Sequence, residues 1–251
     1  MIIAYKTDQG KRRGKNEDAI LVDQDRGLFL LADGISRHPA GEIASELVVR
    51  KVHAYLGDRV QSLTRGDDIC GLLSDAIIHA DTMLKKKAEA DITLRGMGTT
   101  LVAMLIKDRR AFICHVGDSR AYRLRKTIER ITVDHTFQCE LDDCIMIRDF
   151  FFRKNARILT QAIGVSKELT LETNRLRLQQ GDILLLCSDG LTDMLSDDEI
   201  HEIIRANSEA DAAVNALVCE ANREGGKDNI SIILVKWTGM EENGETSIKG
   251  G

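Results

Sequence analysis

Four aspartates stand where strand-like apolar runs meet a turn. Asp33 ends FLLAD, Asp189 ends LLLCSD, Asp118 follows an apolar run in HVGDSR, and Asp228 precedes one in KDNISIILV. Carboxylate oxygens are the ligands that Mg²⁺ and Mn²⁺ prefer. Each aspartate taken singly is equally an ordinary turn residue. Four such acids together favour a metal site, in which two cations would offset the carboxylate repulsion and turn a bridging water into a nucleophile.

The composition is that of a globular protein with a slight acidic excess. The chain has 251 residues and a net charge of −5, which argues against a nucleic-acid partner. No apolar run reaches the roughly 20 residues that span a bilayer, and the start MIIAYKTDQGKRRG lacks the order of a signal peptide. We therefore predict a cytoplasmic protein with no membrane partner.

The elements that must position these acids follow from hydrophobic periodicity. Helical patterns occupy about 40–56, 68–90, 197–206 and 209–223. Ser196 followed by Glu199 fits a capping box at the start of the third helix, and Ser208 with Asp211 resembles one at the start of the fourth. Strand-like runs lie at 2–6, 19–23, 28–32, 99–106, 111–116, 120–124, 183–188 and 230–236. No proline- or glycine-rich linker interrupts them, so we predict one domain over 1–237 and a disordered polar tail over 238–251.

The strand patterns also indicate how the elements are layered. Apolar residues fall on both faces of the runs 99–106 and 182–188, so each of those sheets must be covered on both sides. Short connections between consecutive strands favour antiparallel pairing. Together these features favour a layered α+β sandwich.

Eight segments, in this order, resemble the metal-dependent protein serine/threonine phosphatases of the PP2C (PPM) family, in the compact form found in bacteria. They are TDQGKRRGKNEDA, LLADGISRHPAGEIAS, GMGTTLVAMLI, HVGDSRAYRL, TVDHT, LTQAIG, GDILLLCSDGLTD and KDNISIILV, and they extend from residue 7 to residue 235. Several motifs in the correct order are far more specific than one short pattern. The resemblance implies a four-layer αββα sandwich of two antiparallel sheets flanked by helices, and a monomer.

The resemblance assigns two central cations, Mn²⁺ or Mg²⁺, to the acids at the strand ends. Asp33 and the backbone carbonyl of Gly34 match ligands of these ions, and Asp189 and Asp228 match the remaining ones. Asp118, together with Asp189, matches the acid that holds a third, weaker ion in the family.

Residues in the segment KRRGKNED complete the implied site. Glu17 corresponds to a residue that reaches a metal through water, and Asp18 supports the site. Arg13 corresponds to the arginine that binds the substrate phosphate, a role that suits the fixed fork of donors in a guanidinium group. Its neighbours Lys11, Arg12 and Lys15 are interpreted as solvated surface charges.

The implied reaction is hydrolysis of phosphoserine and phosphothreonine in proteins, opposing a serine/threonine kinase. A metal-bridging hydroxide would attack phosphorus in line, with Arg13, Asp33, Asp189 and Asp228 as the catalytic set. Two alternatives remain: a non-catalytic phosphoprotein-binding module of the same fold, and a phosphatase for small molecules.

Two segments depart from the family pattern. The family usually continues its metal-binding Asp-Gly with Met-Gly-Gly-His, whereas this chain has Ile35-Ser36-Arg37-His38, where Arg37 could add a phosphate contact or point to solvent. The segment expected to form a flap carries three consecutive phenylalanines, 150–152. They could dock a phosphoprotein or pack the flap onto the body.

Overall fold

The computed structural model describes residues 1–35, 40–64, 68–138, 145–147, 150–152 and 157–239. The side chains of 58, 138, 145–147, 150–152 and 157 are not among the parts described. Arg37, residues 240–251 of the predicted tail and the side chains of the phenylalanine triplet therefore lie outside the description. The domain boundary at residue 237 stays a prediction.

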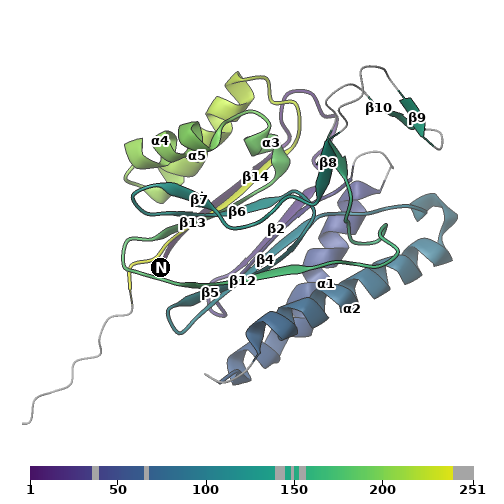
Figure 1. Ribbon diagram of the computed structural model, residues 1–251, viewed down its shortest axis with the longest axis horizontal. Helices are drawn as coiled ribbons and strands as arrows, with labels where there is room; N and C mark the ends of the chain where they lie inside the picture. The colour runs from purple at the N-terminus through teal and green to yellow at the C-terminus, as the bar shows by residue number, and fades with distance from the viewer. Residues whose placement is uncertain (36–39, 65–67, 139–144, 148–149, 153–156, 240–251) are drawn as a thin grey trace, which may run out of the picture.

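Two five-stranded antiparallel sheets form the centre of the molecule (Figure 1). The strand order in one sheet is β1 (Ile2–Asp8), β14 (Ile230–Lys236), β13 (Ile183–Cys187), β6 (Arg120–Leu124) and β7 (Ile128–Arg130). The order in the other is β12 (Glu172–Arg177), β5 (Arg110–Val116), β4 (Leu101–Lys107), β3 (Leu28–Asp33) and β2 (Asp18–Asp23). The predicted antiparallel pairing is confirmed.

Helices cover the outer face of each sheet. The long helices α1 (Gly41–Ser62) and α2 (Ile69–Ala90), followed by the 3₁₀ turn η1 (Ile92–Leu94), pack on the β2–β12 sheet. The sheet that contains β14 is covered by α3 (Asp189–Thr192), α4 (Asp197–Ala206) and α5 (Ala210–Arg223). Three apolar layers result, one under each group of helices and one between the sheets. The expected αββα sandwich is confirmed.

Sequence periodicity explains most of these elements. Strands β3, β4, β13 and β14 are apolar on both faces because one face meets helices and the other meets the opposite sheet. Helix α4 begins with a complete capping box between Ser196 and Glu199. A similar cap predicted at Ser208 is wrong, because α5 has the extended residue Glu209 as its N-cap and no side-chain cap bond.

Short strands form the base of the expected flap. Strand β8 (Thr136–Gln138) pairs with β11 (Arg157–Leu159), and β9 (Ile145–Ile147) pairs with β10 (Phe150–Phe152). Strand β8 projects from the end of the sandwich where the two sheets approach each other (Figure 1). Within the described ranges, none of the helices combines the length and the apolar character that a membrane span requires.

The layer between the sheets can be tested by emptying it. Leu186 on β13 is fully buried there, whereas Ile78 on α2 is 50% exposed. We expect Leu186→Ala to lower the free energy of unfolding by about 2–5 kcal/mol, through lost burial and the cavity left behind. Ile78→Ala should cost less than about 1 kcal/mol. Urea unfolding of both variants measures the difference, and equal losses would contradict this packing.

Candidate active site

Two of the predicted acids face each other across a pair of strands. Asp18 begins β2 and is the direct cross-strand partner of Asp33 at the end of β3. The turn that follows is tight: the amide of Gly34 donates to the carbonyl of Glu17 at 3.2 Å. A Cβ on Gly34 would lie 2.4 Å from the carbonyl oxygen of Gly41. Only glycine fits at that position, because the backbone of α1 approaches too closely.

Two threonines fix the backbone of Asp33. Its carbonyl accepts from the Thr100 amide at 2.8 Å and from Thr99 Oγ1 at 2.8 Å, and its amide donates to Thr100 Oγ1 at 3.1 Å. Thr100 Oγ1 also shares a 2.7 Å hydrogen bond with Ser119, the residue after Asp118. The segment GTT at 98–100 therefore links the Asp33 turn to the Asp118 loop.

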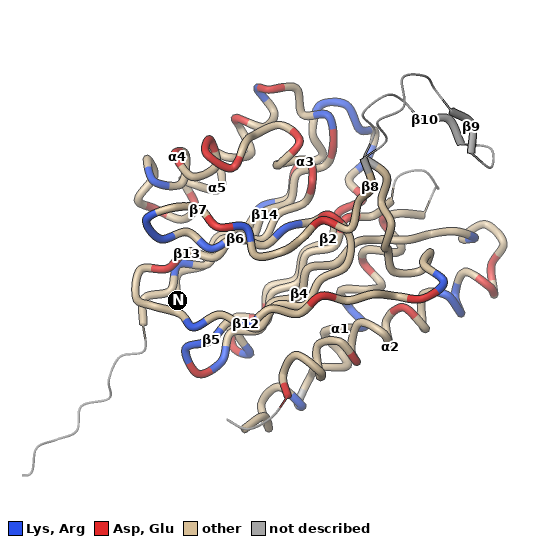
Figure 2. Tube along the Cα trace, viewed as in Figure 1, with Lys and Arg blue, Asp and Glu red and all other residues tan. Residues whose placement is uncertain are grey.

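The opposite sheet supplies two further acids. Asp189 follows β13 and opens the short helix α3, while Asp228 lies two residues before β14. Ser188 joins the sheets at this point, because its Oγ donates to Asp18 Oδ2 at 2.9 Å and accepts from the Ser231 amide at 2.9 Å. The ends of both sheets are thus fixed together, and Figure 2 shows acidic positions gathered near β2 and β8 in this region.

The charges of these acids act on one another. The pKa of Asp33 is raised well above its ordinary value by burial and then by the charges of the other four acids, Asp18, Asp189, Asp118 and Asp228. Burial, together with Asp189 and Asp228, raises the pKa of Asp18 to about 7. The structure therefore brings all five aspartates to one place, which the irregular sequence spacing did not show.

The donor set suits hard divalent cations. Asp18 Oδ1 is buried and has no hydrogen-bond partner within the described ranges. An unpaired buried oxygen among five carboxylates is unfavourable unless positive charge compensates it. Oxygen donors of this kind match Mg²⁺ and Mn²⁺. The residues present thus fit the expected cations.

Arg13 lies at the edge of this acidic group. Its Nη2 donates to Asp228 Oδ2 at 2.5 Å, and its side chain is 36% exposed. Although burial alone would lower the pKa of Arg13, the bond to Asp228 and the charges of Asp189 and Asp33 raise it. The guanidinium is therefore charged and oriented, with donors left for an anion that enters the site.

Lys15 and Asn229 make contacts at the site that the sequence did not suggest. Lys15, interpreted as a solvated charge, makes ion pairs with Glu17 Oε1 at 3.1 Å and Glu42 Oε2 at 2.7 Å. Glu17 itself is buried, only 5% exposed.

The buried Asn229 accepts from the Glu17 amide and donates to the carbonyls of Gln9 and Lys15. Asn229 thereby holds the Arg13 and Glu17 segment against the start of β14, and only its place beside Asp228 could have suggested this.

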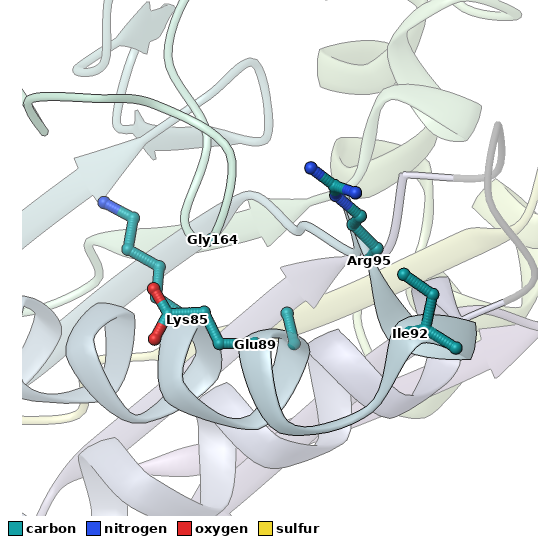
Figure 3. Close-up of a pocket in the computed structure, with 6 residues that line it drawn as sticks. Lys85, Glu89, Ile92, Arg95 and Gly164 are labelled. Carbon is teal, nitrogen blue, oxygen red and sulfur yellow. The ribbon is translucent and has the colours of Figure 1, made fainter.

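A cavity and a second donor cluster lie among residues that the sequence did not assign to the site. A cavity of about 390 Å³ lies between the end of α2 and the Gly164 turn (Figure 3). It is lined by Lys85, Ala88, Glu89, Ile92, Arg95 and Gly164. Donor atoms of His115, His135 and Glu172 lie within 4.8 Å of one another.

Comparison with known proteins gives a consistent result. The sequence profile of the family described as protein phosphatase 2C matches residues 11–219. The serine/threonine phosphatase Stp of Listeria innocua is 33% identical over 249 residues, which cover 97% of this chain and 98% of that protein. PstP of Mycobacterium tuberculosis is 35% identical over 235 residues, 92% of this chain and 44% of PstP.

Solved structures agree with the sequence comparison. The crystal structure of M. tuberculosis PstP has a TM-score of 0.80 and 30% identity, over 94% of this chain and 98% of that one. A PstP catalytic domain in complex with two manganese ions has a TM-score of 0.75 and 29% identity, over 92% and 96% of the two chains. This chain is a member of the protein phosphatase 2C family.

Proposed function

We propose that this protein hydrolyses phosphoserine and phosphothreonine in proteins and that it requires Mn²⁺ or Mg²⁺. The observation that carries the proposal is the convergence of five aspartates beside one oriented arginine. Support also comes from the names of the relatives, which are serine/threonine phosphatases, and from the two manganese ions in the PstP catalytic domain.

Seven residues would form the metal site. Asp33, Asp189, Asp228 and the Gly34 carbonyl would hold two central cations, and Asp118 with Asp189 would hold a third. Glu17 would act through water, and Asp18 would support the site. When bound, the cations would supply charge neutralisation and an acidified water as the nucleophile. The third ion and the preference between Mn²⁺ and Mg²⁺ are parts of this proposal.

Arg13 would bind the phosphate of the substrate. Its guanidinium has five N–H donors, of which one bonds to Asp228 among the residues described. The others can meet two phosphate oxygens and stabilise the charge that develops on them as phosphorus is attacked. Water replaces the serine or threonine oxygen on phosphorus, and that oxygen leaves as a hydroxyl after taking a proton. The side chain of Ile35, directly after Asp33-Gly34, cannot act as the general acid that supplies this proton.

The substrate would be a phosphoprotein made by a serine/threonine kinase. That kinase is the partner that the proposal implies, and a cytoplasmic monomer remains part of the same prediction. Arg37, which could add a phosphate contact or point to solvent, lies outside the described residues. A chain that bound phosphoproteins without hydrolysing them would release no phosphate from a phosphothreonine peptide with either metal, so turnover by the wild-type protein separates the two hypotheses.

The metal ligands should be indispensable for turnover. We expect Asp33→Asn and Asp189→Asn each to lower kcat by about 100-fold or more. Mutation of a residue that only supports a metal ligand already lowers metal affinity or activity by about 10–100-fold, and these two residues would bind the metal directly. Phosphate release from a phosphothreonine peptide in Mn²⁺ measures this. Asp75→Asn, at an exposed position on α2, is the control for loss of one negative charge. Near-full activity in either site variant would mean that the metal site is wrongly assigned.

Arg13 should act mainly on the chemical step. Arg13→Ala removes the phosphate donors and should lower kcat by about 10²–10³-fold, the range seen when one transition-state donor is removed. Arg13→Lys keeps the charge but not the fork, so we expect it to recover only part of the loss. Arg12→Ala changes an exposed neighbour and serves as the control. Equal activity of Arg13→Ala and Arg12→Ala would remove Arg13 from the mechanism.

Metal binding should stabilise the fold measurably. Because cations offset the repulsion among the aspartates, Mn²⁺ at 100 times its Kd should raise the free energy of unfolding by about 2.7 kcal/mol for one site. Urea unfolding with Mn²⁺ and with EDTA measures the increase. The increase should be largely lost in Asp33→Asn. A wild-type protein whose unfolding curve is identical with and without Mn²⁺ would contradict the proposed site.

A further inference from the structure

His135 makes a reciprocal pair of hydrogen bonds with Gly117. The His135 amide donates to the Gly117 carbonyl at 2.9 Å, and the Gly117 amide donates to His135 Nδ1 at 3.2 Å. We propose that His135 is a positioning residue that holds the Asp118 loop, residues 117–119, at the active site. This inference rests on the proposed function, in which Asp118 is a metal ligand.

The loop requires an anchor at Gly117, on the N-terminal side of Asp118. Gly117 has φ +102°, a conformation that other residues rarely adopt, and a Cβ there would lie 2.6 Å from the side chain of Thr100. Gly117 therefore has no side chain of its own to fix it. On the other side of Asp118, Ser119 is bonded to Thr100 at 2.7 Å. Thr100 and His135 thus hold the two residues that flank Asp118.

The hydrogen bonds also fix the tautomers of two histidines. Since Nδ1 of His135 accepts from Gly117, the proton of the neutral ring lies on Nε2, which is 3.7 Å from Glu172 Oε1. His115 Nε2 is 2.9 Å from the carbonyl of Val133 and so carries its proton. Its Nδ1 is left buried without a partner in the described part of the chain.

This geometry disfavours a cation between the two rings. The rings are stacked, with centroids 4.9 Å apart and planes 27° apart. Nitrogen lone pairs lie in the ring plane, so lone pairs of stacked rings do not converge on one ion. Nε2 of His135 also carries the proton while Nδ1 accepts from Gly117. The cluster of His115, His135 and Glu172 therefore suits packing and orientation, not metal binding.

His135 also connects the loop to the base of the flap. Strand β8 begins at the next residue, Thr136, and pairs with β11. Thr160, directly after β11, donates its amide to the His135 carbonyl at 2.8 Å. The start of β8 and the end of β11, which pair through Thr136 and Leu159, are thus joined at the residue that holds Gly117. A change in His135 should disturb the Asp118 loop more than a change in the more deeply buried ring of His115.

Three variants separate this role from simple packing. His135→Leu removes the acceptor for Gly117, whereas His135→Asn keeps one, because asparagine Oδ1 is attached to Cγ as Nδ1 is in histidine. His115→Leu is the matched control, since it removes the stacked ring and leaves the Gly117 bonds in place. Calorimetric Mn²⁺ titration, kcat and KM for a phosphothreonine peptide, and hydrogen exchange at the Gly117 amide are measured in each folded variant.

We expect His135→Leu to weaken Mn²⁺ binding and to lower kcat, each by about 10-fold or more, with little change in KM. Faster exchange at Gly117 should accompany these losses. His135→Asn should recover most of each, and His115→Leu should stay close to wild type. Unchanged Mn²⁺ affinity in His135→Leu, or an equal loss in His115→Leu, would overturn the proposal, as would His135→Asn behaving like His135→Leu.

The readouts also separate this inference from the proposed function. Mn²⁺ titration and Gly117 exchange require no turnover, so they test the positioning role even if the wild-type protein hydrolyses no phosphopeptide. A wild-type protein that binds Mn²⁺ without turnover would overturn the phosphatase proposal alone. A nitrogen NMR spectrum that shows protonated Nδ1 in neutral His135 would overturn the positioning role alone.

Discussion

Repulsion among carboxylates is the constraint on which the rest of the structure depends. Asp18 and Asp33 are cross-strand partners, and three more aspartates are close enough to raise the pKa of Asp33 further. Without compensation such a group favours protonation or separation of the acids. Divalent cations would offset this repulsion, and the protein must hold the acids in place until they bind.

The two sheets provide that rigidity. Their apolar faces are packed between helices and against each other, which leaves the strand ends little freedom to move apart. Polar links then join the ends: Ser188 connects the β13 side to Asp18, and Asn229 connects the β14 side to the Glu17 segment. Thr100 ties Asp33 to the Asp118 loop, and His135 holds the far side of that loop.

Much of this arrangement could be predicted from the chain, and the failures have identifiable physical causes. Apolar runs predicted the strand that ends at Asp33 and the strand that ends two residues before Asp118, because burial on both faces leaves a clear sequence pattern. The convergence of the acids depended on the family resemblance, since pairing between distant strands leaves no regular spacing.

Residues whose roles arise from long-range contacts were missed. Lys15 was interpreted as a surface charge because its partner Glu42 lies on α1, far along the sequence. Asn229 and His135 act through backbone groups of other segments, which no local pattern reveals. The cap expected at Ser208 was wrong because the helix starts after the extended residue Glu209.

The proposed function depends on the aspartate group, which would make this protein a metal-dependent phosphatase. Release of phosphate from a phosphothreonine peptide, measured on the metal-depleted wild-type protein before and after addition of Mn²⁺ or Mg²⁺, tests it most directly. We expect negligible release in EDTA and catalytic turnover once either ion is restored. Turnover that persists in EDTA, or a folded protein that binds Mn²⁺ and releases no phosphate, would contradict it.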